Sequence, residues 1–154
     1  MIIMEKIASF TIDHTKLEKG MYISRIDGDV ITYDIRMKKP NVDDYLSNGS
    51  MHTFEHLFAT YARNSEFKDF VIYVGPMGCR TGFYLLMRDK VSVADTIKMV
   101  REAFTFISNF KGKVPGTDPI ECGNYKEHDL IGAKLIAKDM LAVLEFWTEN
   151  NVNY

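Results

Sequence analysis

The stretch MYISRIDGDVITYDIRM at 21–37 carries the strongest signal for the fold of this 154-residue chain. Two apolar-rich runs, 21–26 and 30–37, flank Asp27-Gly28-Asp29, and a D-G pair between such runs is typical of a β-hairpin turn. In the later run every second residue is apolar, namely Ile31, Tyr33, Ile35 and Met37. This period of two predicts a strand with one face toward a core. Asp34 and Arg36 share the mixed face, so Arg36 points outward or into a site.

Further strands and helices are predicted around this hairpin. The run 6–13 resembles a strand, and the apolar runs 70–75 and 82–87 predict two more strands around the turn 75–79. Apolar residues at helical spacing predict helices from Ser50 to about Asn64, from Val93 to Phe110 and from Asp129 to Glu149, with Ser50 and Ser92 as N-terminal caps. This order predicts a single α+β domain over 1–154, with a mostly antiparallel sheet packed against three or four helices.

Composition argues against several classes of function. The chain has 26% charged residues and a net charge of −2, which gives no electrostatic case for nucleic acid or an anionic membrane surface. No segment approaches the roughly 20 apolar residues of a membrane span, and the N-terminus lacks the apolar run of a signal peptide. We therefore expect a cytoplasmic protein. Its two cysteines, Cys79 and Cys122, do not imply a disulfide framework.

The motif HTFEH at 52–56 lies in the first two turns of the helix predicted from Ser50. Residues four apart lie one helical turn apart, so His52 and His56 can both point a ring nitrogen at one ion. Glu55 can reach a metal-bound water or a substrate without ligating. A catalytic site of the zinc type needs a third protein ligand and an open position. The candidates for that third ligand are Cys122, His128 and His14.

The two cysteines suit different roles. Cys122 lies beside Gly123 in the long loop 111–128, and a metal would hold its thiol deprotonated, so it suits a ligand. Cys79 stands on a glycine-bounded turn with room for a ligand near the backbone. Arg80 would stabilise a Cys79 thiolate if its side chain points that way. Cys79 is therefore predicted to be an acid/base group or a nucleophile, and a disulfide with Cys122 is disfavoured in a cytosolic chain.

Five segments, in this order, resemble the S-ribosylhomocysteine lyase (LuxS) family: SFTIDHTKL, DIRMKKPN, HTFEHLFATYARN, GPMGCRTGFY and ECGNYKEH. The resemblance runs from about Ser9 to the last helix. It implies an α+β homodimer with its active sites at the dimer interface and parts of each site lent by the second subunit. It further implies one divalent metal per subunit and a set of site residues: His52, His56 and Cys122 as metal ligands, Cys79 and Glu55 as acid/base groups, and Ser9, His14 and Arg36 near the substrate.

The resemblance also implies a reaction. The substrate would be S-ribosylhomocysteine, and the products homocysteine and 4,5-dihydroxy-2,3-pentanedione, the precursor of the quorum-sensing signal autoinducer-2. Two carbonyl shifts would precede a β-elimination that releases the thiol, as in the recycling of thioethers in the activated methyl cycle. The metal would polarise a carbonyl, and Cys79 and Glu55 would move protons. Fe²⁺ is favoured in the cell, with Zn²⁺ or Co²⁺ possible. No fingerprint for a nucleotide cofactor is present.

The sequence departs from the family at one position, and two other functions compete with the lyase. Many family members carry an Asp where this chain has Tyr73, so one substrate contact is expected to be replaced or lost. A metallopeptidase of the HxxEH type would use Glu55 to activate water and would not need Cys79. A structural metal domain would close the site with a fourth protein ligand, such as His128 or Cys79.

Overall fold

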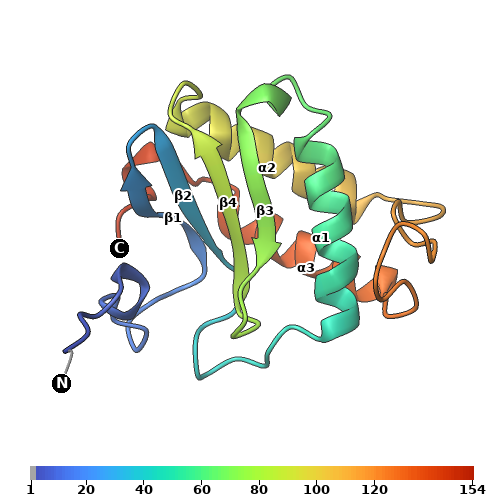
Figure 1. Ribbon diagram of the computed structural model, residues 1–154, viewed down its shortest axis with the longest axis horizontal. Helices are drawn as coiled ribbons and strands as arrows, with labels where there is room; N and C mark the ends of the chain where they lie inside the picture. The colour runs from blue at the N-terminus through green and yellow to red at the C-terminus, as the bar shows by residue number, and fades with distance from the viewer. Residues whose placement is uncertain (1–2) are drawn as a thin grey trace.

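The computed structural model describes residues 3–154 and shows an α+β fold, as predicted (Figure 1). Four strands form one antiparallel sheet in the order β1-β2-β4-β3. Their bounds are β1 Gly20–Asp27, β2 Val30–Arg36, β3 Val71–Pro76 and β4 Gly82–Arg88. Three helices accompany the sheet: α1 Asn48–Ala62, α2 Val93–Ser108 and α3 Leu130–Leu144. Within the described residues, no helix is both long and apolar enough to cross a bilayer.

The predicted hairpin is present between β1 and β2. Asp27 pairs with Val30, so a two-residue turn joins the strands. Gly28 in that turn has a φ of 59°, a left-handed conformation that glycine adopts without a steric penalty. β2 then pairs with β4, and Arg36 stands opposite Gly82. This pairing brings the end of β2 beside the turn that carries Cys79.

The core lies between the sheet and the helices. The alternating residues of β2 face it, with Tyr33 and Ile35 fully buried. Phe54 of α1 packs against Phe83 of β4 and Phe104 of α2, with ring centroids 5.0 and 5.2 Å apart. Buried aromatic side chains of this size are a major source of folding free energy. His52, Glu55 and His56 of the same helix are only partly buried, because they lie outside this aromatic face.

The prediction of a strand at 6–13 is wrong. Residues Ala8–Phe10 form a short 3-10 turn, in which Thr11 donates both its backbone N–H and its hydroxyl to the Ala8 carbonyl. A strand there would need a free sheet edge. The outer edge of β1 is contacted instead by the end of the chain, because the Ile23 N–H donates to the Val152 carbonyl at 2.8 Å.

Two helix boundaries also differ from the prediction. Ser47, not Ser50, caps α1 by accepting the Ser50 N–H, and the Ser50 hydroxyl donates to Asp129 across to α3. Helix α3 ends at Leu144 rather than Glu149. The side chain of Arg101 caps that end by donating to the Leu144 carbonyl at 2.9 Å. The predicted Ser92 cap of α2 is confirmed.

Candidate active site

Four side chains converge between α1 and the loop that follows α2. The potential ligand atoms of His52, His56, Cys122 and His128 all lie within 4.8 Å of one another. Cys122 Sγ lies 3.4 Å from His52 Nε2 and 3.9 Å from His56 Nε2. The structure thus brings His52 and His56 together with two of the candidates for the third ligand, Cys122 and His128, and leaves the other candidate, His14, outside the cluster.

Backbone carbonyls fix the orientation of both helix histidines. His52 Nδ1 lies 2.9 Å from the Glu127 carbonyl, and His56 Nδ1 lies 2.9 Å from the Pro115 carbonyl. A carbonyl can only accept a hydrogen bond, so in the neutral imidazole the proton is on Nδ1 and Nε2 keeps a free lone pair for a metal. Hydrogen bonds of this kind orient the histidine ligands of metal sites.

The loop packs tightly against α1 at Gly116. Its φ of 76° lies in the left-handed region, and a Cβ at this position would stand 2.9 Å from His56 Nδ1. The end of the loop is held as well, since the Asp129 N–H donates to Thr53 Oγ1 at 2.9 Å and to the Gly49 carbonyl at 3.1 Å. Contacts at both places therefore hold the loop in position against α1.

Substitution of Gly116 with alanine should weaken metal binding about tenfold, because an added Cβ strains the backbone and pushes the His56 ring out of line. Gly123 is the matched control in the same loop, since a Cβ there meets nothing within 4 Å. Titration of both variants against a competing chelator measures the effect. Equal affinities in Gly116→Ala and Gly123→Ala would contradict this account of the loop.

His128 is the fourth residue of the cluster. Its ring stacks on that of His52, with centroids 4.1 Å apart, and its Nδ1 lies 2.9 Å from Thr53 Oγ1. Its Nε2 is buried and has no hydrogen-bond partner among residues 3–154. Burial lowers the pKa of His128, and the neighbouring His52 and His56 lower it further. His128 is thus suited to stay neutral, as a metal ligand must be.

The donor set fits a divalent metal. Nitrogen and sulfur ligands at tetrahedral positions around zinc stand roughly 3.5 Å apart, given bond lengths of about 2.0 and 2.3 Å. The sulfur–nitrogen distances of 3.4 and 3.9 Å match that spacing. Imidazole and thiolate ligands suit zinc, iron and cobalt. Glu55, on the same helix, is partly exposed and lies outside the four-residue cluster.

Cys79 lies in a second, separate site. It is an exposed free thiol on the turn between β3 and β4, and Cys122 is free as well. It lines a cavity of about 300 Å³ together with His14, Arg36, Pro40, Asn41, Tyr45 and Thr81. The Sγ atom lies 3.1 Å from Thr81 Oγ1 and 4.0 Å from Arg36 Nη1. Sequence reasoning missed Thr81, whose only signal is its place two residues after Cys79.

The cation beside Cys79 is Arg36, and the expectation for Arg80 is wrong. Arg80 has a left-handed backbone with a φ of 60°, its guanidinium donates to the Leu46 carbonyl, and it lies 5.6 Å above the Tyr45 ring. Arg36 points into the site and is only 2% exposed. Burial alone would lower the pKa of Arg36, but the paired Asp34 carboxylate outweighs it and raises that pKa. Arg36 is therefore a fixed positive charge.

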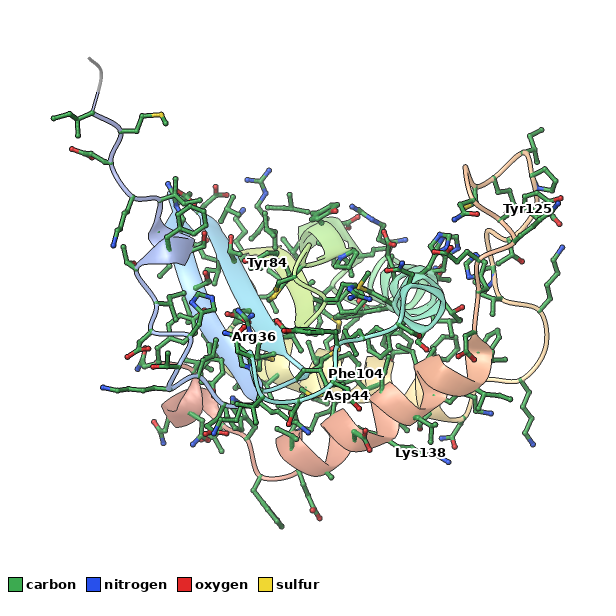
Figure 2. The ribbon with its side chains drawn as sticks, turned by 90° about the horizontal axis from the view of Figure 1, so that it is seen from below. Arg36, Asp44, Tyr84, Phe104, Tyr125 and Lys138 are labelled. Carbon is green, nitrogen blue, oxygen red and sulfur yellow. The ribbon has the colours of Figure 1, made fainter. Side chains whose placement is uncertain are left out.

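The remaining predicted residues occupy other places. Ser9 lines a cavity of about 360 Å³ over the sheet, and Tyr73 and Tyr84 line the same cavity. Figure 2 shows Arg36 on the sheet side of the molecule and Tyr125, in the loop that carries Cys122, on the opposite side. The cavity at Cys79 includes none of the four cluster residues.

Comparison with known proteins gives one consistent result. A family model described as S-ribosylhomocysteinase (LuxS) matches residues 7–151. A protein of Phocaeicola vulgatus named S-ribosylhomocysteine lyase is 48% identical, over 98% of both chains. Proteins of the same name from Porphyromonas gingivalis and Clostridium acetobutylicum are 48% and 44% identical, over 98% of this chain and 99% of their own. The chain therefore belongs to the S-ribosylhomocysteinase (LuxS) family of lyases.

Proposed function

We propose that this chain, as one domain over 1–154, cleaves the thioether of S-ribosylhomocysteine. The products are homocysteine and 4,5-dihydroxy-2,3-pentanedione, the autoinducer-2 precursor. The reaction serves signalling or the recycling of thioethers in the activated methyl cycle. The observation that carries the proposal is the convergence of His52, His56 and Cys122 in a chain whose full-length relatives bear the name of this lyase.

The chemistry requires groups that move protons. A thioether leaves readily only by β-elimination next to a carbonyl, so the carbonyl must first shift along the sugar in two steps. Each shift removes a proton beside a carbonyl and returns one nearby. Cys79, as a thiolate beside Arg36 and Thr81, takes and returns these protons. Glu55 moves protons among the hydroxyls and assists the elimination. Such general acid–base groups contribute about 10²–10⁴-fold each.

His52, His56 and Cys122 hold one divalent metal per subunit in this proposal. The hydrogen bonds at Nδ1 orient both rings, and their Nε2 atoms lie 3.4 and 3.9 Å from the Cys122 sulfur, which supports this ligand set. When bound, the metal supplies Lewis acidity to a substrate oxygen. We propose Fe²⁺ as the metal in the cell, with Zn²⁺ and Co²⁺ as competent replacements. A site that depends on free thiols suits the reducing cytoplasm.

His14 and Arg36 bind the substrate at the Cys79 cavity, which both line. Ser9 contributes from the neighbouring cavity over the sheet, where Tyr73 takes the place of the family's Asp. A tyrosine offers a phenolic hydroxyl at this position, whereas an aspartate offers a carboxylate. This chain therefore binds the substrate without the anionic contact that an Asp at this position would provide.

The active enzyme is a homodimer in this proposal, with its sites at the interface. Four large apolar side chains near the N-terminus are strongly exposed: Ile3 at 89%, Met4 at 87%, Ile7 at 56% and Phe10 at 69%. A second copy that covers them would remove this apolar surface from water. It would also let the metal cluster of one copy meet the Cys79 cavity of the other. Sedimentation equilibrium should give a mass about twice the 17.7 kDa of the chain.

A closed structural metal site is the second candidate, because His128 offers a fourth donor atom within the cluster. The visible spectrum of the cobalt-loaded protein separates the two. An open catalytic site should change its spectrum when S-ribosylhomocysteine is added. A spectrum that stays the same at saturating substrate would favour the structural reading.

Free thiol should appear from S-ribosylhomocysteine in the presence of the metal-loaded protein and fall at least tenfold after removal of the metal by a chelator. Activity should return when Fe²⁺, Zn²⁺ or Co²⁺ is added back. The thiol can be followed by a colorimetric thiol reagent. Equal rates with and without bound metal would rule out the proposed metal dependence.

A further inference from the structure

A chain of polar contacts leads from Tyr154 to Cys79 across the mixed face of β2. The Tyr154 hydroxyl donates to Asp34 Oδ2 at 2.6 Å. The Asp34 carboxylate in turn accepts two hydrogen bonds from Arg36, from Nε at 3.1 Å and from Nη2 at 2.7 Å. The remaining guanidinium nitrogen, Nη1, donates to Thr81 Oγ1 at 2.8 Å and lies 4.0 Å from Cys79 Sγ.

The two charges in this chain are almost completely removed from water. Asp34 is 1% exposed and Arg36 is 2% exposed. Buried charges are tolerated only when hydrogen bonds satisfy them, so the geometry of the pair is strongly constrained. The fork between Asp34 and Arg36 fixes the guanidinium plane, and that plane sets where Nη1 lies relative to the Cys79 sulfur.

Tyr154 is 49% exposed, and two contacts place its ring beside β1. Its ring stacks on Tyr22, with centroids 5.0 Å apart and an interplanar angle of 20°. The Val152 carbonyl two residues earlier is bound to β1 by the Ile23 N–H. Burial raises the pKa of Tyr154, and the Asp34 carboxylate raises it further, so the phenol keeps its proton at physiological pH.

We infer that Tyr154 is a positioning residue for the Cys79 thiolate, acting through Asp34 and Arg36. By donating to Asp34, the hydroxyl draws negative charge from the carboxylate toward itself. Arg36 then directs more of its positive charge at Thr81 and the Cys79 sulfur. The inference rests on the proposed role of Cys79 as a proton carrier, but its test needs neither substrate nor lyase activity.

The test must hold the other groups around the sulfur constant. The titratable and charged groups around Cys79 come from several elements: Asp34 and Arg36 from β2, Tyr84 from β4, His14 from the N-terminal segment, and Tyr45 from the loop before α1. A change from tyrosine to phenylalanine at 154 removes the hydrogen bond to Asp34 and touches none of the other groups directly. It removes one hydroxyl and keeps the ring that stacks on Tyr22.

Alkylation of Cys79 by iodoacetamide, measured against pH on the metal-loaded full chain, reports thiolate formation. The variant Cys79→Ala gives the background from Cys122. In Tyr154→Phe the midpoint of the alkylation profile should move up by about half a pH unit, which means about threefold slower alkylation below the midpoint. Tyr22→Phe is the matched control, because its hydroxyl donates to the Glu18 carbonyl and not to Asp34. Its profile should match the wild type.

Two results would overturn the inference. One is a Tyr154→Phe profile that superimposes on that of the wild type. The other is an equal shift in Tyr154→Phe and Tyr22→Phe, which would assign the effect to packing of the aromatic pair. Thermal unfolding of both variants verifies that each is folded at the temperature of the alkylation. A failure of lyase activity in the wild type would leave either profile, and therefore this test, intact.

Discussion

Replacing Cys122 with alanine should remove the metal from the protein, whereas replacing Cys79 with alanine should leave the metal content unchanged. Cys122 supplies the only thiolate within reach of His52 Nε2 and His56 Nε2 among the described residues. Two imidazoles without that charge hold a divalent ion far more weakly, by more than about 100-fold in affinity. Cys79 lies in a different cavity and contributes no ligand.

The measurement is the amount of metal per subunit after dialysis against a weak chelator, by atomic emission. His128 makes the result more informative, because it could partly replace the lost thiolate. Residual binding in Cys122→Ala that disappears in the double variant Cys122→Ala/His128→Ala would identify such a replacement. Equal metal loss in Cys122→Ala and Cys79→Ala would contradict the different roles assigned to the two thiols.

Cys79→Ala should lower the rate of thiol release from S-ribosylhomocysteine by about 10³-fold while the metal remains bound. The loss follows from removing the group that takes and returns protons during the carbonyl shifts. Cys79→Ser is the matched variant, because a serine hydroxyl can still hydrogen-bond to Thr81 but does not ionise near neutral pH. We expect the serine variant to be about as inactive as the alanine variant.

The assay compares the kcat values of fully metal-loaded variants. Near-normal activity in Cys79→Ser would show that a hydrogen bond, rather than a thiolate, is what the site needs. Wild-type activity in Cys79→Ala with metal bound would exclude the proposed lyase chemistry. It would favour a reaction in which Glu55 activates a metal-bound water, as in an HxxEH peptidase.

Local patterns predicted the parts of the structure that depend on neighbours in the sequence. The turn at Gly28, the alternation along β2 and the four-residue spacing of His52 and His56 were all readable, because hairpins and helices impose fixed periods. The strand at 6–13 was not, since its pattern fits a strand but the edge of β1 is contacted by the end of the chain at Val152. A sheet edge is a tertiary property that no local pattern contains.

The neighbours of Cys79 show the same limit. Arg80 was the expected cation because it is adjacent in sequence, but a turn separates the directions of adjacent side chains. Arg36 is 43 residues away and reaches the sulfur because β2 and β4 pair in a register that sets it opposite Gly82. Cys122 could be proposed as a metal ligand from its chemistry. The contacts of Asp34 and Thr81 with Arg36 depend on that register and could not be predicted from the sequence.

The backbone hydrogen bonds to the two helix histidines have a consequence for how this sequence can vary. Both acceptors are main-chain oxygens, at Pro115 and Glu127, so the side chains at these positions take no part in orienting the histidines. Natural drift or directed evolution can change the identity of residue 127 and keep the imidazole tautomers intact, provided that the loop path is preserved. Mutational tolerance should therefore follow backbone geometry in this loop, with Gly116 as the intolerant position and the exposed Glu127 as a permissive one.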